Sequence, residues 1–594
     1  MKEDGNMKNI LKYTMMLVLP LAFAACTEEM DEMMQPTSEL QFVVGDFPAY
    51  DATTRAIGTS DKGKTEWTNG DQLIVTIGGN NMADQSLTLT LSIGGDNSHE
   101  WTPDKTIKYD KKVTPELTVT AIYAPCYEVD ADGNKVLKEG MQLGMTEYLT
   151  AHCDETDGYV NINFDGVIRD YSRLRIAGLK NTAYTVTTTD FTPVGGGTVP
   201  TDGYTLVTDE KGNAYLYGTF AKDATVTVKV GETELRKHTF TYSATEDAKS
   251  YVLDAIPTYT YDETTKTYYV YKVEGLYAWN TAAQTDLSTN LVLMADITMS
   301  TVADGENNWT PVGTATTNNH YTGTIEGNGY TISGLTINGK IVSAGFVGYA
   351  LNATIQNLTL TQVNVTASNP VHVGGIVGYA RNSTISGCAV TGNLTATGST
   401  ATWLTIGGIA GWVYNTDVTD CKNEANLTSS AEFTGIFAMG GITGKSNASI
   451  NGCTNSGSVT GGSTTNENTT AAIGGIVGQY EGEKYEISLG GEVQSYYAVM
   501  HKNTNSGSVI GGSATNIYTG GLAGMEKSTV GDSATYGSVV FSCNSNSGTV
   551  KDKDGNELNC LVGGSATRES DSETYQPLTM LTDCDGSCSS ASGE

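Results

Sequence analysis

Three aromatic residues follow successive copies of a glycine-rich pentapeptide, in an arrangement that could bind carbohydrate. The pentapeptide occurs as AGFVG, GGIVG, GGIAG, GGITG, GGIVG and GGLAG, at 344–348, 374–378, 407–411, 440–444, 474–478 and 520–524. Tyr349, Tyr379 and Trp412 directly follow the first three copies. If they face outward in a row, their rings form a stripe on which sugar rings can stack. The alternative is a structural ladder in which the three rings stack on one another.

Three cysteines keep the period of the pentapeptide. Cys388, Cys421 and Cys453 lie 12 or 13 residues after the second glycine of their copies. Three interpretations stay open: small buried thiols in a ladder, a disulfide between neighbouring turns, or a metal site. Three thiols in line on one sheet do not form a tetrahedron, so we predict no metal and no cofactor. Cys584 and Cys588, in the polar stretch CDGSC, are expected to pair with each other.

The repeats lack the residue sets of the common carbohydrate-cleaving reactions. A lyase needs a base and cations that hold acidic sugars, yet Arg381 is the only arginine between Gly275 and Gly564. A hydrolase needs two facing carboxylates. Asp417 and Asp420 are close in sequence, but no partner recurs at the matching place in the next repeats. We therefore predict no catalytic residues, and an enzyme is the least favoured class of function.

The net charge excludes one class of partner. The chain has 594 residues, with 34 basic and 66 acidic side chains and a formal net charge of −32. Such a charge repels phosphate groups, so we predict no nucleic-acid binding.

The N-terminus reads as an export signal. Basic residues and an apolar stretch too short to span a membrane precede the sequence FAAC, which predicts a signal peptide over 1–25. FAAC resembles a bacterial lipobox, with Phe23 where leucine is usual, and the resemblance implies that Cys26 is lipidated and anchors the chain in the outer membrane. The alternative is ordinary cleavage that leaves a free cysteine. The acidic linker over 26–39 begins TEEMDE after Cys26, which resembles the surface-export signal of Bacteroidetes lipoproteins.

The region 40–257 alternates polar and apolar residues in short runs. Examples are DQLIVTIGG at 71–79 and ATVTVKVGETELRKHTFTY at 224–242, separated by turns rich in Asp, Gly and Asn. A period of two with hairpin turns predicts antiparallel sheets. The length of the region fits two β-sandwiches.

The start of this region carries a family resemblance. DATTRA at 51–56, followed by EWTNGDQLIV at 66–75, resembles the Bacteroidetes fimbrillin-like subunits. The resemblance implies cleavage between Arg55 and Ala56, loss of an N-terminal strand, and filling of the resulting groove by a strand of another fimbrial subunit. The alternative is an exposed arginine that is not cut.

The pentapeptides set the period of the second half. Their second glycines stand at 345, 375, 408, 441, 475 and 521, so successive spacings are 30, 33, 33, 34 and 46. Such a period predicts a solenoid. We expect a right-handed parallel β-helix over 274–564, in which GGIVG is itself one strand of each turn and its central apolar residue points inward. The sequence resembles GLUG-repeat proteins over this range.

The remaining segments complete the predicted all-β organisation. A Tyr-rich hairpin over 258–273 connects the two halves, residues 274–285 form a short helix, and 565–594 is a polar tail. Asp532-Ser533-Ala534 resembles the acceptor motif of Bacteroidetes O-glycosylation, which makes Ser533 a candidate site. We expect a surface lipoprotein with a structural or adhesive role, a fimbria-like subunit or adhesin. The alternative is a monomeric glycan-binding lipoprotein of a polysaccharide-uptake system.

Overall fold

The chain folds almost entirely into β-strands, with one α-helix in the part that the structure describes. The computed structural model describes residues 38–48, 64–164, 167, 169, 171–241, 250–400, 403–462, 470–482, 484–489, 492–497, 499–514, 516–529, 540–558 and 560–568. Two compact units divide between Ala255 and Ile256, close to the boundary drawn from the sequence. Within the described ranges, no helix has the length and apolar character that crossing a membrane requires.

The first unit begins with a β-sandwich. Its larger sheet has the order β10-β7-β3-β4-β5 and its smaller sheet the order β11-β12-β2. The strands are β2 (Gln41–Val44), β3 (Gln72–Gly79), β4 (Met82–Ile93), β5 (His99–Pro103), β7 (Leu117–Tyr123), β10 (Leu149–Thr150), β11 (His152–Thr156) and β12 (Tyr159–Asn163). β1 (Ser38–Glu39), within the predicted linker, pairs with β6 (Lys108–Tyr109). β8 (Tyr127–Val129) and β9 (Lys135–Leu137) form a separate hairpin.

Trp67 is buried in the core of this sandwich. It is 4% exposed, donates from Nε1 to the Gly45 carbonyl oxygen at 2.9 Å, and contacts the rings of Phe47 and Phe164 edge-on. The turn that follows it is closed by Asp71, which accepts the Thr68 amide at 2.6 Å. Burial of a large aromatic side chain with a satisfied N–H makes this residue an anchor of the sandwich.

A second sandwich follows in the same unit. One sheet has the order β15-β17-β13-β20 and the other β16-β14-β18-β19. The strands are β13 (Ser172–Ala177), β14 (Ala183–Thr188), β15 (Phe191–Pro193), β16 (Tyr204–Val207), β17 (Asn213–Phe220), β18 (Thr225–Val230), β19 (Thr233–Thr239) and β20 (Ser250–Asp254). Alternate residues of β17 are buried, as the period of two predicts. The expectation of two sandwiches is therefore confirmed.

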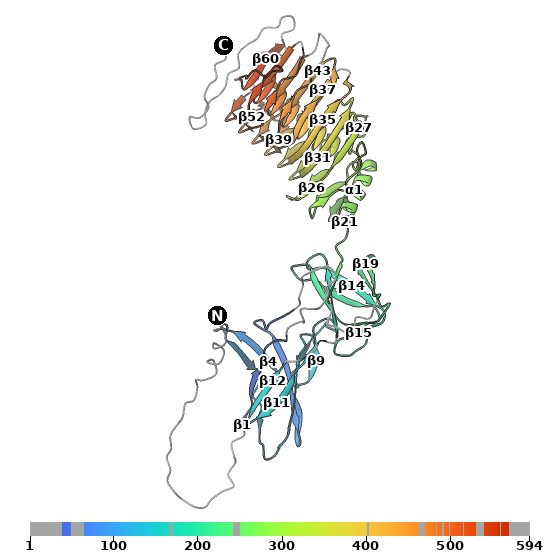
Figure 1. The fold of residues 1–594 in the computed structure, drawn as a ribbon, viewed down its shortest axis with the longest axis vertical. Helices are drawn as coiled ribbons and strands as arrows, with labels where there is room; N and C mark the ends of the chain where they lie inside the picture. The colour runs from blue at the N-terminus through green and yellow to red at the C-terminus, as the bar shows by residue number, and fades with distance from the viewer. Residues whose placement is uncertain are drawn as a thin grey trace, which may run out of the picture. The chain divides into compact units, whose positions relative to one another are not determined.

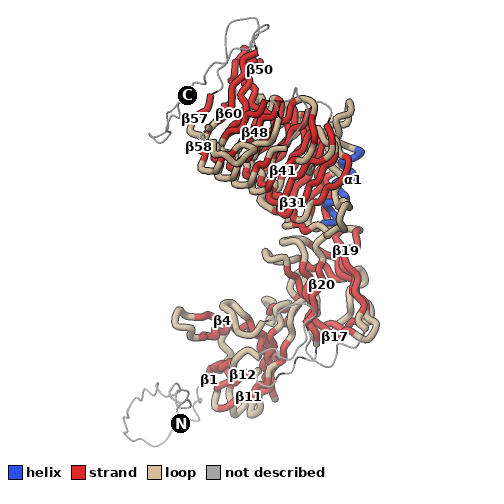
Figure 2. The backbone as a smooth tube through the Cα atoms, turned by 45° about the horizontal axis from the view of Figure 1, so that its top comes forward, coloured by secondary structure: helices blue, strands red, loops and turns tan. Residues whose placement is uncertain are grey.

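The second unit is a parallel β-helix (Figure 1). One turn consists of β32 (His372–Gly374), β33 (Val377–Arg381), β34 (Thr384–Ser386) and β35 (Ala389–Thr397), each in a different parallel sheet. These sheets have six, seven, ten and thirteen strands. The red strands of Figure 2 show the repeated turns stacked along the unit. Each turn stacks on the next, so the inward apolar residues of successive turns form one continuous core.

The glycine-rich pentapeptide is a corner between two strands, and the prediction that it is itself a strand is wrong. β32 ends at Gly374 and β33 begins at Val377. A Cβ on Gly374 would lie 2.1 Å from the Val377 carbonyl oxygen, so only glycine permits so tight a bend. The central residue does point inward, because Ile376, Ile409 and their counterparts Ile442, Ile476 and Leu522 are fully buried.

A ladder of asparagines, three buried and the last half-buried, runs parallel to this apolar core. Asn423, Asn455, Asn505 and Asn546 align on successive turns. The amide nitrogen of each of the first three donates to the side-chain oxygen of the next, at 2.7, 2.8 and 2.7 Å. Because every internal amide has a partner above and below, the ladder fixes the register of the turns.

The first and late turns depart from the regular pattern. β21 (Tyr259–Asp262) and β22 (Thr267–Val270) form the Tyr-rich hairpin, and β22 pairs in parallel with β23 (Asn290–Leu293), so the hairpin belongs to the β-helix rather than standing apart as a connector. The helix α1 (Val273–Thr285) packs beside these strands. The long spacing of 46 contains an inserted hairpin, β50 (Lys484–Leu489) with β51 (Glu492–Tyr497). The last strand, β60 (Val562–Arg568), extends past the predicted end at 564.

Candidate functional site

Two parallel sheets of the β-helix meet through the side chains that point away from its core. The six-stranded sheet contains β28 (Ser343–Ala344), β32, β37 (Trp403–Gly407), β43 (Ile436–Gly440), β48 (Thr470–Gly474) and β55 (Asn516–Gly520). The seven-stranded sheet contains β29 (Val347–Leu351), β33, β38 (Ala410–Tyr414), β44 (Thr443–Ser446), β49 (Val477–Gly482), β56 (Ala523–Thr529) and β60. Glycines let the sheets approach, since a Cβ on Gly378 would lie 3.0 Å from the Cβ of Ser343.

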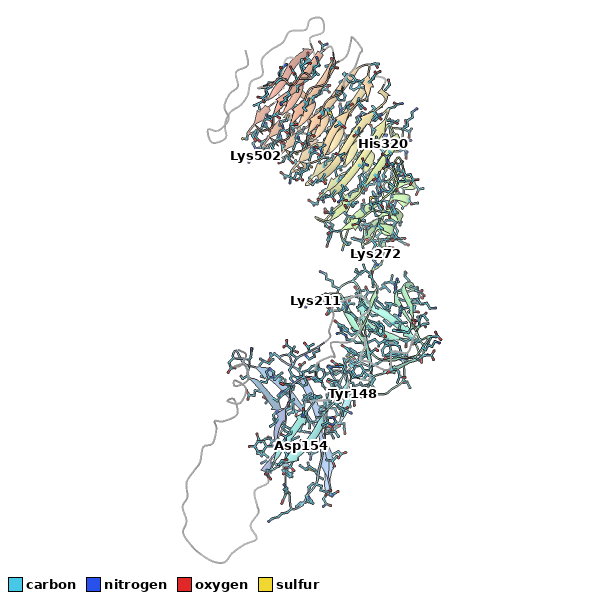
Figure 3. The ribbon with its side chains drawn as sticks, viewed as in Figure 1. Tyr148, Asp154, Lys211, Lys272, His320 and Lys502 are labelled. Carbon is cyan, nitrogen blue, oxygen red and sulfur yellow. The ribbon has the colours of Figure 1, made fainter. Side chains whose placement is uncertain are left out.

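The predicted aromatic residues lie between these sheets and stack on one another. The ring centroids of Tyr349 and Tyr379 are 4.4 Å apart in a stacked arrangement, and Tyr379 meets Trp412 edge-on at 5.1 Å. His320, labelled in Figure 3, stacks on the other face of Tyr349 at 4.2 Å. Trp403 stacks on Trp412 at 5.3 Å. We call these five rings, together with His372 described below, the aromatic seam.

The seam is not the exposed stripe that strict alternation predicts. Tyr379 is only 9% exposed, and Tyr349, Trp412 and Trp403 are half-buried. The reason is that the outer face of one sheet folds back against its neighbour, which the sequence does not reveal. The faces that a sugar would need are largely occupied by the neighbouring rings.

The sequence analysis missed three members of this site, His320, His372 and Trp403. His372 precedes the pentapeptide, and its ring lies 5.2 Å from Tyr379 and 5.6 Å from Trp412. Its Nδ1 is 2.8 Å from the hydroxyl of the buried Thr405. His372 and Trp403 lie on the strand before the corner, and no repeat of residue type at those positions marks them in the sequence.

The seam continues into a buried polar group on the next turns. The position of Trp412 pairs with Lys445, and that of Lys445 pairs with Gln479. The Lys445 ammonium lies 4.4 Å from the centroid of Trp412 and 4.5 Å from that of Trp403. It also lies 3.0 Å from Oε1 of Glu481. A buried cation between two indole rings and a carboxylate is held by cation–π attraction and by a charge-assisted hydrogen bond.

Burial controls the protonation of the seam. Desolvation lowers the pKa of His372 to about 3, and the positive charge of Lys445 acts in the same direction. His372 is therefore neutral over the physiological range. Desolvation likewise raises the pKa of Tyr379 well above its usual value, with Tyr349 adding to the effect. The seam thus offers neither a poised base nor an ionised phenol.

The three periodic cysteines form a ladder of buried free thiols. Cys388, Cys421 and Cys453 are at most 1% exposed and form no disulfide bond. The Cys453 sulfur lies 3.6 Å from the Val418 carbonyl oxygen. On the next turn the ladder continues with Asn503, whose Oδ1 accepts the Cys453 amide at 2.9 Å. A hydrogen bond with Cys421, and then desolvation, raise the pKa of the Cys388 thiol. For Cys421 the hydrogen bond with Cys388 lowers the pKa, but the hydrogen bond with Cys453 and desolvation outweigh it, so both thiols stay protonated.

The other predicted site residues lie outside the described residues. They are the lipidation candidate, the two residues at the predicted cut, the glycosylation candidate and the predicted cysteine pair: Cys26, Arg55, Ala56, Ser533, Cys584 and Cys588. Searching the described residues finds no group of three or more His, Cys, Asp or Glu side chains that could hold a metal ion.

Comparison with known proteins identifies one repeat. Residues 369–399 match the family model of the GLUG motif, and this range contains the turn that contributes His372 and Tyr379 to the seam. No curated protein matches the sequence. The match therefore covers one turn of the longer range over which the sequence resembles GLUG-repeat proteins.

Three solved structures show remote similarity. A candidate immunoglobulin A1 protease from Bacteroides ovatus is 17% identical, covers 53% of this chain and 84% of its own, and has a TM-score of 0.35. A candidate cell adhesion protein from Bacteroides fragilis is 11% identical, with coverages of 37% and 92% and a TM-score of 0.22. An IgA1 protease is 13% identical, with coverages of 60% and 29% and a TM-score of 0.25.

Proposed function

We propose that the chain is a bacterial surface lipoprotein with a structural and adhesive role, in which the β-helix is a stiff presenting domain. The observation that carries the proposal is how the β-helix uses its aromatic, thiol and amide side chains. The aromatic seam, the thiol ladder and the asparagine ladder all connect one turn to the next. Side chains used in this way stabilise a solenoid and are not arranged around a substrate, so the proposal includes no catalytic step and no nucleic acid.

An adhesion assay tests this role directly. Cells that produce the full chain are compared with cells that produce residues 1–255 alone, with surface amounts matched by antibody labelling. We expect binding to immobilised host or polysaccharide glycans, or to neighbouring cells, to fall at least about tenfold when the β-helix is missing. Equal binding by the two strains would contradict an adhesive role for this unit.

The N-terminal strand suits a second part of the proposal, strand exchange with other fimbrial subunits. β2 is the edge strand of its sheet and pairs in parallel with β12. Leu40 and Phe47, on either side of β2, are buried in the sandwich core. Cleavage after Arg55 would detach this segment and free the edge of β12, together with an apolar groove, for a neighbouring strand.

Mass spectrometry of the mature N-terminus on intact cells distinguishes the two fates of the chain. A lipid-modified Cys26 would support permanent anchoring in the outer membrane. A chain that begins at Ala56 would support processing and strand exchange, because the cut also removes the lipid. Any other N-terminus would contradict both, and an Arg55→Ala variant provides the matched control for the cut.

The alternative function, glycan binding, has one observation in its favour. An open cavity of about 470 Å³ lies beside α1 in the first turns of the β-helix, with an aromatic and polar lining. The residues that line it are Tyr277, Asn280, Thr281, Ser300, Val302, Asn307, Asn308, Trp309 and Thr310. Amides and hydroxyls around an aromatic ring suit a sugar.

A glycan array with variants of the full chain shows whether a glycan binds at this cavity or at the aromatic seam. We expect Tyr277→Ala to abolish any glycan binding by the full chain. Replacing Tyr349, Tyr379 and Trp412 together with alanine should have a smaller effect, because their faces are already occupied. A loss confined to the triple variant would locate the glycan at the seam instead.

A further inference from the structure

The buried polar group at the end of the aromatic seam has the components of a covalent crosslink. Lys445 on β44 and Gln479 on β49 are register partners in parallel neighbouring strands. Neighbouring strands lie about 4.8 Å apart, and partner side chains leave the sheet on the same face. Lys445 is 3% exposed and Gln479 is fully buried. A primary amine and a carboxamide are thus held side by side away from water.

Glu481 contacts both of these groups through a single oxygen. Its Oε1 lies 3.0 Å from Nζ of Lys445 and accepts a hydrogen bond from Nε2 of Gln479, also at 3.0 Å. The two nitrogens are therefore no further apart than twice that distance. A carboxylate in this position can take a proton from the amine and deliver it to the amide nitrogen.

The surroundings favour reaction between Lys445 and Gln479 over a simple ion pair of Lys445 with Glu481. The indole rings of Trp403 and Trp412 lie over the Lys445 nitrogen. On the far side of Gln479, the next rung is Met525, which is 5% exposed. The Gln479 carbonyl oxygen is buried and has no hydrogen-bond partner among the described residues. A buried amide oxygen without a partner is costly to keep, and the amine beside it is shielded from water.

We propose that Lys445 and Gln479 form an intramolecular isopeptide bond, with Glu481 as the acid–base group. Glu481 takes a proton from Nζ of Lys445, and the neutral amine attacks Cδ of Gln479. The Nζ–Cδ bond forms and the Cδ–Nε2 bond breaks. Glu481 returns the proton to Nε2, Nζ releases a second proton as it becomes an amide N–H, and the Gln479 nitrogen leaves as ammonium. No oxidant, reductant or further reactant is needed, because an amide is exchanged for an amide.

The bond joins two consecutive turns of the solenoid directly before the inserted hairpin. Turns of a repeat protein are otherwise held only by contacts with their neighbours. A covalent link between β44 and β49 prevents these turns from separating when the chain is pulled or transiently opened. This inference does not depend on lipidation, strand exchange or glycan binding.

Peptide mapping of the denatured full chain tests the bond. Trypsin cuts after Lys422, Lys445 and Lys484, so an unlinked chain gives peptides 423–445 and 446–484. The crosslink acylates Lys445 and blocks that cut. We expect a single peptide, 423–484, lighter than its sequence by one molecule of ammonia, with fragment ions that place the link between Lys445 and Gln479.

Three variants define the roles of the residues. Glu481→Gln retains the amine and the amide, and we expect its rate of crosslinking to fall about 100-fold or more, the lower range for loss of an acid–base group. Lys445→Arg should give no crosslink. Lys422→Arg is the matched control, since Lys422 is exposed and still leaves a trypsin site, and it should crosslink fully.

Several results would overturn the proposal. The two separate peptides at unmodified mass from the native protein would show that no bond forms. A joined peptide lighter by water would identify Glu481 as the acceptor in place of Gln479. Full crosslinking in Glu481→Gln would remove the carboxylate from the mechanism. Because the native chain alone decides the first two points, a variant that fails to fold does not affect them.

Discussion

The first sandwich and the β-helix are both all-β, yet they use buried polar and aromatic residues in different ways. In the sandwich such residues do not recur at a matching position of successive strands. Trp67 and the buried ion pair of Arg169 and Glu147 are examples. Their partners come from segments distant in sequence, since Trp67 contacts Phe164. In the β-helix the same residue type recurs turn after turn, as in the asparagine ladder. The sandwich therefore depends on single anchors, and the solenoid on repeated small contributions.

This difference predicts how damage spreads through each region. In a sandwich with one core, loss of an anchor lowers the stability of all strands together. In a solenoid each turn contacts only its neighbours, so the same loss opens a few turns and leaves the rest folded. The predictions below test this contrast, from the largest expected effect to the smallest.

Replacing one buried tryptophan in each region gives the sharpest test. Trp67 and Trp309 are 4% and 3% exposed, and each donates its indole N–H to a carbonyl oxygen at 2.9 Å. We expect Trp67→Ala and Trp309→Ala each to cost about 3–5 kcal/mol in local stability. Hydrogen exchange should rise throughout the first sandwich in Trp67→Ala, but only around the first turns in Trp309→Ala. Exchange that rises over the whole β-helix would contradict the contrast.

The asparagine ladder provides the second test. In Asn455→Ala, the Asn423 amide loses one of its two acceptors, since it also donates to the Ala425 carbonyl oxygen, and no Asn455 amide remains to donate to the Asn505 side-chain oxygen. Each buried group left unpaired costs about 1–3 kcal/mol. We expect faster exchange in the turns that contain Asn423 and Asn505. Asn426→Ala is the matched control, because Asn426 is exposed and water can replace its hydrogen bonds with Ser458, so exchange should rise much less.

The buried Glu526 makes the late turns sensitive to pH. Desolvation raises its pKa from the model-compound value of 4.5 to about 7. A raised folded-state pKa means that stability is full below the unfolded pKa and is lost as pH rises to the folded pKa. We expect the late turns to lose on the order of 1 kcal/mol per pH unit between about pH 4.5 and 7. Glu526→Gln should remove this slope in denaturant titrations at several pH values, and an unchanged slope would contradict it.

The outer surface of the β-helix should be the least sensitive region. The hydroxyls of Thr395 and Thr428 lie 3.0 Å apart on successive turns at an exposed position. Because water can replace this contact, we expect Thr395→Val to change stability by less than about 0.5 kcal/mol. Thermal unfolding measures it, and a larger loss would mean that surface ladders also hold the turns together.

The sequence predicts the fold class well because the fold depends on periodic patterns. A period of two indicated the sandwiches, and the recurring pentapeptide with its buried isoleucines indicated the solenoid. The strand boundaries in each turn were predicted less well, since GGIVG contains β-forming residues but is a corner. The asparagine ladder was readable in principle, because Asn455, Asn505 and Asn546 all begin an NSG tripeptide.

The candidate site could be predicted only in part. Alternation of inward and outward residues correctly predicted that Tyr379 points away from the solenoid core. It did not predict what the ring would face. That depends on a neighbouring sheet, and Trp403 and His372 come from strands whose outward residues follow no repeat. Lys445 and Gln479 were visible at the matching position, and Glu481 lies two residues after Gln479 on the same strand. That Glu481 also reaches Lys445 depends on the register between turns. Register between turns is a long-range property of the folded chain.

The inserted hairpin shows how such a protein can acquire new surface. β50 and β51 leave and rejoin the chain between β49 and β52 (Val499–His501), while β45 (Ile450–Asn451) still pairs with β52 and Lys445, Gln479 and Met525 keep their alignment. The added residues are thus accommodated within one turn, and the register of the other turns is unchanged. Sequence can therefore be added at such a position without redesigning the turns on either side of it.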